Sequence, residues 1–150
     1  LSRRTIETGL WFQDLSRIRK NGVYPVQPLN ILLISPDLMS TSKLAGLAKE
    51  ANGLLETLRS LSEQPRSKHY DLVLLDIQAF QEDPAVLVAK VRLLLDNISQ
   101  KDTGIRLIAF GPHVHKQRLD DAVAAGVDEA VSRGELFGGF PALLRRWIKH

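Results

Sequence analysis

The stretch "YDLVLLDIQAF", residues 70–80, decides the fold expected of this 150-residue sequence. Four consecutive apolar residues, 72–75, lead directly into a single carboxylate, Asp76. A continuous apolar run of this length predicts a strand that is buried on both faces. An acidic side chain at the end of such a strand costs free energy unless a partner or a ligand compensates it. Asp76 is therefore a candidate catalytic acid, metal ligand or phosphate acceptor, or a carboxylate that serves the structure alone.

Similar apolar runs recur along the chain, and each is followed by a stretch with helical periodicity. Strands are predicted at 31–34, 71–75, 105–110 and 127–132, and helices over the stretches 38–49, 82–99, 115–126 and 140–150. Asp83 and Pro84 are typical of a helix cap and a first helical position. Strands without alternation, each followed by a helix, predict a parallel sheet that is covered on both faces.

The stretch "GLLETLRSLSEQP", residues 53–65, fits two structures. Leu54, Leu55, Leu58 and Leu61 have helical spacing, whereas Leu55, Thr57 and Arg59 alternate as in an edge strand. Right-handed crossovers favour a strand on either side of the helix at 38–49. We therefore expect a fifth strand here, followed by a short helix. The predicted fold is an α/β sandwich with a doubly wound, five-stranded parallel sheet.

The first 29 residues are expected to lie outside this domain, which would span residues 30–150. Residues 2–20 have the periodicity of an amphipathic helix, with Ile6, Leu10, Trp11, Leu15 and Ile18 near one face. Gly22, Pro25 and Pro28 then predict an extended linker. Trp11 and Phe12 are adjacent and point about 100° apart on a helix. One of them is therefore a candidate anchor for a partner, while the other packs on the domain of the same chain.

Composition and charge narrow the possible functions. Hydrophobic residues make up 44% of the chain and charged residues 25%, as in ordinary globular proteins. No apolar run approaches the roughly 18 residues of a membrane span, and the start lacks the apolar segment of a signal peptide. The chain has no cysteine, which excludes disulfides, zinc thiolates and cysteine nucleophiles. A cytoplasmic protein is expected.

The charge is uneven: residues 1–30 and 141–150 each carry a net +3, whereas the segment between them carries −3. Basic ends can contact an acidic protein, a membrane surface or nucleic acid, although solvated helix faces are the ordinary explanation. Few aromatic residues interleave with the basic ones, so nucleic acid and membrane surfaces rank last among the partners.

In open parallel sheets, ligands bind beyond the carboxyl ends of the strands. Those ends bring together 35–37, Asp76, 111–113 and 132–133. The chain contains no nucleophile elbow and no glycine-rich nucleotide-binding motif. His113 and His115 lack the third and fourth ligands that a zinc site needs. No enzymatic activity is expected from these motifs.

The strand end "DLVLLDI", the helix end "AAG" before "VDEAVSR" and the five strand–helix units resemble the receiver domains of bacterial response regulators. The resemblance covers residues 30–150 and implies a flavodoxin-like sandwich. More narrowly, "SPDLM", "AFGPHV" and "AGVDEAVSRGELF" resemble stand-alone receiver-like proteins without an output domain. In two-component signalling, the aspartate at the position of Asp76 accepts a phosphoryl group from a histidine kinase.

The resemblance also implies supporting groups, and this sequence departs from most of them. The acidic pair that holds Mg²⁺ falls on Ser35 and Pro36, with Asp37 one residue late and expected to point away. The hydroxyl position after the fourth strand falls on Gly111. The lysine position after the fifth strand falls on Arg133, which keeps the charge but not the compact ammonium.

These departures predict a pseudo-receiver whose phosphoacceptor pocket, made of Ser35, Asp37, Asp76, Gly111 and Arg133, is vestigial. No cofactor is expected. The chain would act as a signalling or scaffold module through contact with a protein partner, and would self-associate. In receivers the last helix belongs to the surface for dimers and outputs, which makes Arg145, Arg146 and Lys149 interface candidates.

Two other functions stay open. One is an atypical response regulator that is phosphorylated on Asp76, with Asp37 and Asp76 holding Mg²⁺ and Arg133 holding the phosphoryl group. The other is binding of nucleic acid or a membrane surface through the basic ends, which would weaken steeply with salt.

Overall fold

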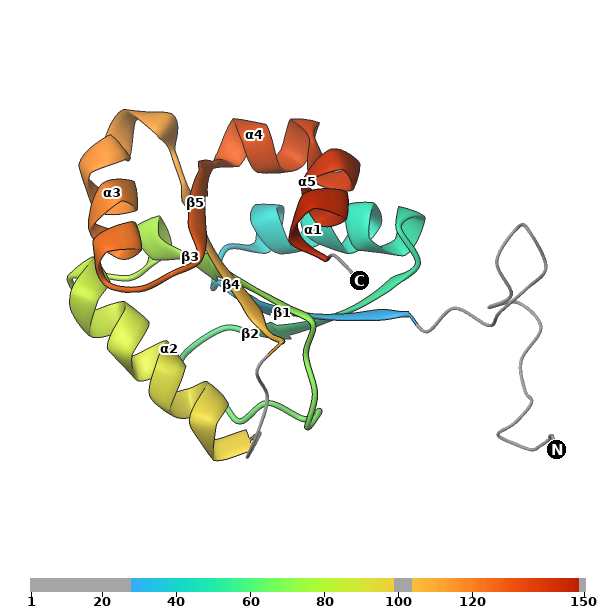
Figure 1. The fold of residues 1–150 in the computed structure, drawn as a ribbon, viewed down its shortest axis with the longest axis horizontal. Coiled ribbons are helices and arrows are strands. Elements are labelled where there is room, and N and C mark those ends of the chain that lie inside the picture. Colours follow the sequence, from blue (N-terminus) through green and yellow to red (C-terminus); the bar gives the residue numbers. More distant parts are fainter. Residues whose placement is uncertain (1–27, 99–103, 149–150) are drawn as a thin grey trace, which may run out of the picture.

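The computed structural model describes residues 28–98 and 104–148, which form a three-layer α/β sandwich (Figure 1). Five parallel strands make the central sheet in the order β2-β1-β3-β4-β5. The strands are β1 (Leu29–Ile34), β2 (Gly53–Leu58), β3 (Leu72–Asp76), β4 (Arg106–Gly111) and β5 (Glu129–Ser132). The five-stranded doubly wound sheet predicted from the apolar runs is confirmed.

Helices cover both faces of the sheet. They are α1 (Leu38–Glu50), α2 (Pro84–Ile98), α3 (Lys116–Ala124), α4 (Arg133–Gly138) and α5 (Phe140–Trp147), with short 3₁₀ turns η2 (Ile77–Ala79) and η3 (His113–His115). In Figure 1, α2 and α3 lie on one side of the sheet, and α1, α4 and α5 on the other. Among the described helices, none is long and apolar enough to cross a membrane.

The continuous apolar runs are explained by two cores, one on each face of the sheet. Successive strand residues point to opposite faces, so Leu32 and Ile34 pack under α2 and α3, while Ile31 and Leu33 pack under α1 and α5. The helix stripes predicted from periodicity complete these cores. Leu87, Val91 and Leu94 of α2 enter the first core, and the second receives, from α5, Phe140, Leu144 and Trp147.

The prediction of a short helix after β2 is wrong. Residues 59–71, all described, form bends and turns. Local side chains satisfy backbone groups that a helix would have paired: the Glu63 carboxylate accepts from the Arg59 N–H at 2.7 Å, and Ser60 Oγ accepts from the Ser62 N–H at 3.3 Å. Side chains that compete for the backbone in this way disfavour a helix.

Tyr70 covers part of the sheet in place of that helix. Its ring is buried in the core under α2 and α3. Its hydroxyl donates to the Glu56 carboxylate on β2 at 2.5 Å and accepts from the Ser67 N–H at 3.1 Å. Glu56 also accepts from the Arg66 N–H at 2.7 Å. The loop is therefore fastened to the edge strand through one carboxylate.

Helix α4 was not predicted, although the sequence contains its signal. Ser132 caps the helix by accepting from the Glu135 N–H at 3.1 Å, and the Glu135 carboxylate accepts from the Ser132 N–H at 2.8 Å. This reciprocal pair is the capping box expected from Ser-x-x-Glu. It places Arg133 on the first turn of α4, directly after β5. The predicted helix 2–20 and most of its linker lie outside the described residues.

Tyr70→Phe should lower the free energy of unfolding at pH 7 by about 1–2 kcal/mol, because Glu56 loses a partly buried hydrogen bond. Burial and the bond to Glu56 raise the pKa of Tyr70 to about 12. The unfolded phenol then releases its proton first, so the wild type should lose stability between about pH 10 and 12. Urea unfolding at pH 7 and pH 11 measures both effects. A stability difference between wild type and variant that stays the same at the two pH values would contradict this account.

Candidate functional site

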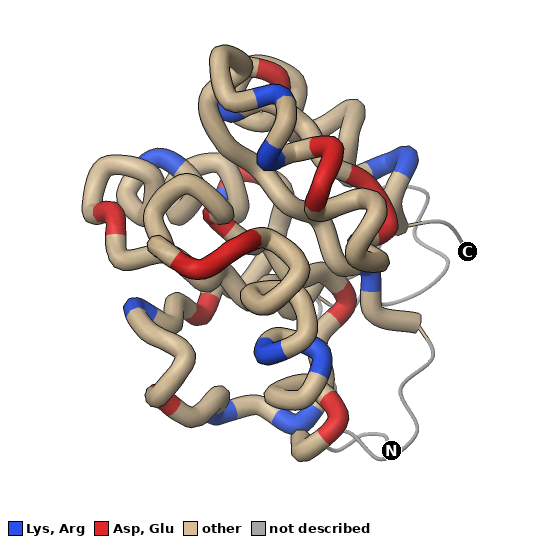
Figure 2. Tube along the Cα trace, turned by 90° about the vertical axis from the view of Figure 1, so that its left-hand side faces the viewer, with Lys and Arg blue, Asp and Glu red and all other residues tan. Residues whose placement is uncertain are grey.

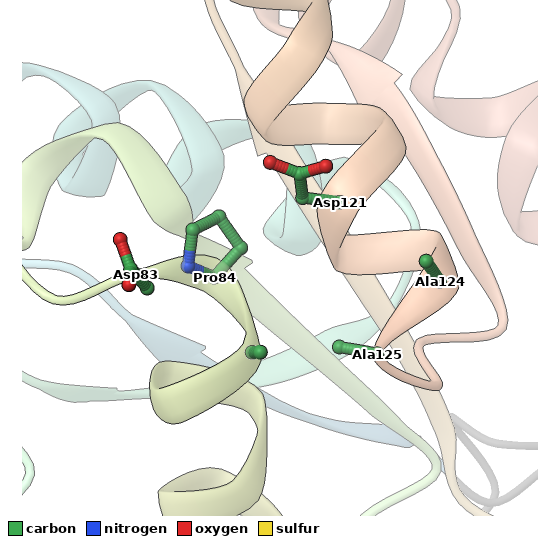
Figure 3. Close-up of a pocket in the computed structure, with 6 residues that line it drawn as sticks. Asp83, Pro84, Asp121, Ala124 and Ala125 are labelled. Atoms are coloured by element: carbon green, nitrogen blue, oxygen red, sulfur yellow. The ribbon is translucent and has the colours of Figure 1, made fainter.

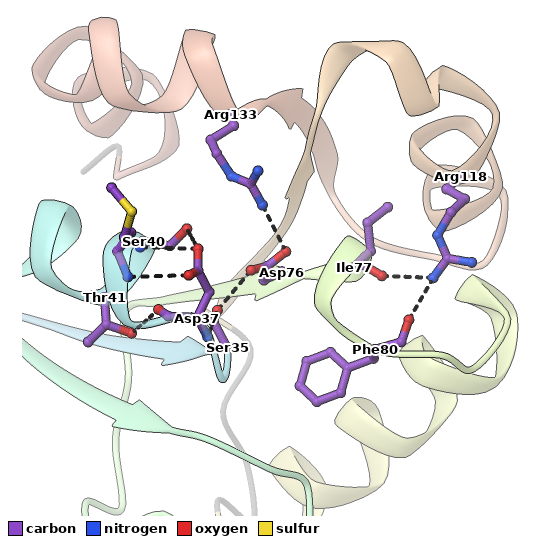
Figure 4. Close-up of polar contacts among 10 residues, drawn as sticks. Ser35, Asp37, Ser40, Thr41, Asp76, Ile77, Phe80, Arg118 and Arg133 are labelled. Atoms are coloured by element: carbon purple, nitrogen blue, oxygen red, sulfur yellow. Dashed lines mark hydrogen bonds and ion pairs between the residues drawn. The ribbon is translucent and has the colours of Figure 1, made fainter.

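Asp76, the last residue of the central strand β3, is fully buried at the carboxyl edge of the sheet. The Ser35 hydroxyl, which follows β1, donates to Asp76 Oδ2 at 2.8 Å. Arg133 Nη2, at the start of α4, lies 3.5 Å from Asp76 Oδ1, and the Ala79 N–H of η2 also donates to this carboxylate. Figure 4 shows Ser35 and Arg133 approaching Asp76 from two sides. The protein itself therefore supplies partners for both carboxylate oxygens.

The electrostatic environment of Asp76 is nevertheless unfavourable for its charged form. Burial raises the pKa of this carboxyl above its usual value, and the charge of Asp37 adds to the rise. The Ser35 hydroxyl and the Arg133 guanidinium oppose the rise without cancelling it. Because burial is the largest contribution, the folded chain disfavours the ionised carboxylate that a nucleophile or a metal ligand has to be.

Asp37 serves α1 as its N-cap. One carboxylate oxygen accepts from the Met39 N–H at 3.2 Å, and the other accepts from the Ser40 N–H at 3.2 Å and the Ser40 hydroxyl at 2.6 Å (Figure 4). The Ser40 hydroxyl is the main reason why the pKa of Asp37 lies below its usual value. The Asp37 N–H in turn donates to Ser35 Oγ at 3.1 Å. Both oxygens of Asp37 are thus engaged by the helix that follows it.

Gly111 and Pro36 also lie at the carboxyl edge of the sheet, at the end of β4 and after β1. Gly111 ends β4 beside Ser132, and an added Cβ there would meet Ile77, Gln78 and Leu119 at ordinary contact distances of 3.5–3.8 Å. A small side chain would therefore fit, but glycine provides no hydroxyl. Pro36 offers only its carbonyl, which accepts from Arg59 Nη2 at 3.2 Å.

The two carboxylates do not fit a magnesium site. Mg²⁺ prefers near-octahedral oxygen ligands and usually takes one or two carboxylates together with waters and substrate phosphates. Here the oxygens of Asp76 face Ser35 and Arg133, and those of Asp37 face the start of α1. Across the described part of the chain, no three His, Asp or Glu side chains gather in a group that could hold a metal ion.

Sequence analysis missed Arg118, which fixes the loop that follows Asp76. Its Nη2 donates to the carbonyls of Ile77, Phe80 and Glu82 at 2.7, 3.3 and 3.1 Å, and Figure 4 shows it reaching this loop from α3. Arg118 Nε is buried without a hydrogen-bond partner. Periodicity could not single out this residue, because its partners are backbone carbonyls about 40 residues away.

The remaining candidates are not among the side-chain partners of Asp76, or they lie outside the described residues. His113 and His115 are exposed on the η3 turn. Arg145 is exposed on α5, and Arg146, also exposed, forms an ion pair with Glu129 of β5, which also accepts from Trp147 Nε1 at 2.9 Å. Trp11, Phe12 and Lys149 are among the residues that the structure does not describe.

Solved structures resemble this fold over most of the chain. A receiver domain of a response regulator from Bermanella marisrubri has a TM-score of 0.62 at 14% identity, covering 82% of this chain and 100% of that chain. The chemotaxis response regulator CheY4 of Vibrio cholerae also has a TM-score of 0.62, at 12% identity, covering 81% and 100%. The chain has the receiver fold.

A putative pilus assembly protein (cpaE) from Burkholderia thailandensis E264 shares this fold with a TM-score of 0.56 at 20% identity, covering 79% of this chain and 97% of that chain. No family model matches the sequence, and no curated protein matches it either. The receiver fold expected from "DLVLLDI" and the five strand–helix units is therefore confirmed by the comparison of structures.

Asp76→Asn should raise the free energy of unfolding at pH 7, because the amide replaces a buried charge whose pKa is raised. A raised folded-state pKa means that the wild type gains stability as pH falls towards the unfolded value of about 4, so the advantage of the variant should vanish there. Thermal unfolding between pH 4 and 8 measures this. Asp37→Asn is the matched control and should give no gain, because the pKa of Asp37 is lowered. A loss of stability in Asp76→Asn at pH 7 would mean that the pairing with Arg133 outweighs burial.

Arg118→Met should lower the free energy of unfolding by about 2–3 kcal/mol, because three carbonyls lose a charged donor. Arg92→Met is the control: its exposed guanidinium donates to one carbonyl, that of Gly126, and its loss should cost about 1 kcal/mol or less. Urea unfolding compares the two variants. Equal losses would show that the three-carbonyl contact contributes nothing beyond an ordinary surface bond.

Proposed function

We propose that this chain is a non-catalytic pseudo-receiver, a signalling or scaffold module that acts by contact with other proteins. The observation that carries the proposal is the occupation of both site carboxylates by the protein itself. Asp76 is held by Ser35 and Arg133, and Asp37 by the start of α1. The groups that would receive a metal and a phosphoryl donor are therefore already in use.

The chemistry of phosphoryl transfer supports this reasoning. The step depends on positioning and on neutralising charge over the phosphoryl oxygens, for which a divalent metal is the usual agent. A buried Asp76 with a raised pKa and no second free carboxylate is poorly suited to bind that metal. Gly111 also provides no hydroxyl to hold the transferred group and move with it.

An assembly role agrees with the surface of the last helix. Arg145 is exposed on α5, whereas Trp147 of the same helix is buried and donates a hydrogen bond to Glu129, so α5 is anchored to the domain and has a basic outer side. Contact through α5 with an acidic protein or with a second copy is the output that we propose, in the cytoplasm. A similar solved structure is described as a putative pilus assembly protein, so the receiver fold is also found in proteins named for assembly.

A second function is favoured by one observation, the 3.5 Å distance between Arg133 Nη2 and Asp76 Oδ1. A guanidinium can bind phosphoryl oxygens with two parallel hydrogen bonds. If the Arg133 side chain, which is 32% exposed, turned towards a phosphoryl group on Asp76, it would act in place of a lysine. The chain would then be an atypical response regulator.

Intact-mass spectrometry after incubation with Mg²⁺ and a small-molecule phosphodonor separates the two functions. We expect no mass increase in the wild type under conditions that fully label an ordinary receiver domain run in parallel. A single added phosphoryl group that is absent in Asp76→Asn would overturn the pseudo-receiver proposal. An adduct that persists in Asp76→Asn would arise elsewhere on the chain and would leave Asp76 unmodified.

A further inference from the structure

A pocket of about 430 Å³ lies between the start of α2 and the end of α3 (Figure 3). Asp83, Pro84 and Ala85 line it from α2, and Asp121, Ala124 and Ala125 from α3 and its C-terminal turn. In Figure 3 the Asp121 side chain leaves α3 on the side next to the start of α2, and Asp83 lies on the other side of Pro84. The pocket thus has small apolar walls and a carboxylate at the rim on either side. It lies away from the Asp76 site and is independent of the function proposed for it.

The two rim carboxylates are not neutralised by the described part of the chain. Neither Asp83 nor Asp121 forms an ion pair with any described Lys or Arg, and among the described residues the Asp121 carboxylate accepts only an amide hydrogen bond, from Gln117 at 2.8 Å. Figure 2 faces this side of the molecule and shows both basic and acidic residues on it. Because both signs are present, the ion pairs identify which acidic residues have a counter-charge. The neighbouring acids Glu82 and Asp120 are paired with Lys90 and Lys116. Arg118 lies close by, because it reaches the Glu82 carbonyl next to Asp83, but its Nη2 is engaged by backbone carbonyls. A pocket with two carboxylates outside any ion pair attracts a further cationic group.

An apolar stripe runs from this pocket along the outer side of α2. Ala85, Val86, Ala89 and Leu93 fall within an arc of about 100° on the helix, and no charged residue up to Leu93 lies inside that arc. Val86 is 46% exposed and Leu93 63% exposed. The opposite side of α2 already fills the core under the sheet. A helix that is apolar on two sides is normally covered on both, so this stripe lacks a partner in the described structure.

The sequence contains one segment with the matching properties, residues 2–20. Its apolar residues, Trp11 among them, are spaced for one face of a helix, and five basic against two acidic residues give it a net charge of +3. Arg3 and Arg4 stand near its beginning. An apolar face would cover the stripe on α2, and an arginine would provide the cation that the pocket attracts.

The length of the chain allows this contact within one molecule. β1 begins at the edge of the sheet towards which α2 runs, and β1 is the neighbour of β3, the strand that precedes α2. Residues 21–28 can span about 25 Å when extended. A helix over 2–20 would be about 28 Å long, whereas α2 with its 15 residues is about 22 Å long. A segment that started from the C-terminal end of α2 would therefore reach the pocket with its first turn.

We propose that residues 2–20 dock as a helix along the outer side of α2 of the same chain, parallel to it, with Arg3 or Arg4 in the pocket between Asp83 and Asp121. Trp11 then lies over the apolar stripe near Ala89. A protein partner with an apolar and basic helix face could compete for the same surface.

The chain has two tryptophans and no cysteine, which allows a paramagnetic test on the full-length protein. Asn97→Cys on α2 carries a nitroxide spin label next to the stripe without entering it, and Ala142→Cys on α5 is the matched exposed control. The Trp11 indole N–H resonance should be broadened by the label at residue 97 and not by the label at residue 142. Trp147, on the same helix as residue 142, should show broadening by the control label.

Charge changes then test the pocket. Asp83→Asn with Asp121→Asn, or Arg3→Gln with Arg4→Gln, should at least halve the broadening of Trp11, and so should raised salt. Lys116→Gln with Asp120→Asn is the control on α3, because it removes an ion pair whose residues do not line the pocket. The Trp147 resonance, whose N–H donates to Glu129, reports that each variant is folded.

Three results would overturn the proposal. Absence of Trp11 broadening by the label at residue 97 would mean that the segment does not dock on α2. Broadening that appears only between an unlabelled isotope-enriched chain and a spin-labelled chain would assign the surface to a second copy. Broadening that is unchanged by the Asp83, Asp121, Arg3 and Arg4 variants would mean that the pocket takes no part.

Discussion

The burial of Asp76 at the end of the central strand is the constraint on which the site depends. A carboxylate with no solvent exposure needs hydrogen bonds or a counter-ion, and here Ser35 and Arg133 provide them. Ser35 is itself fixed by the Asp37 N–H, and Arg133 by the capping box that starts α4. The contacts that compensate the buried Asp76 carboxylate also engage its oxygens, which phosphoryl transfer or metal binding at this edge would need.

The loop that follows Asp76 is held by a second cation. Arg118 reaches from α3 to three carbonyls of residues 77–82 and so ties η2 and the residue stretch before α2 to α3. Receiver-type switching would require a bistable loop or helix at this edge of the sheet. An arginine with three backbone acceptors works against such a transition, and this agrees with a module that presents fixed surfaces.

Those surfaces differ in what they offer. The α5 side is basic and rests on a buried tryptophan, whereas the α2–α3 side combines an apolar stripe with two uncompensated carboxylates. The proposed docking would bring the basic N-terminal segment to two acidic residues of the middle segment, Asp83 and Asp121. If the N-terminal segment covers α2, competition for that side would couple partner binding to release of the segment.

The sequence by itself determined the layers. Short apolar runs without alternation, each followed by a helical stretch, indicate strands of a sheet covered on both faces, and the periodicity of 84–98 and 140–147 predicted which helix sides are buried. It also predicted which residues meet at the carboxyl edge, because parallel strands end together. Tertiary structure alone decided the loop at 59–71, where side chains compete for the backbone, and the roles of Tyr70 and Arg118, whose partners are distant in sequence. Tertiary structure also decided that the Asp76 carboxylate is paired with Ser35 and Arg133. These contacts join residues at the ends of β1 and β3 and at the start of α4, and no local sequence pattern encodes their distances.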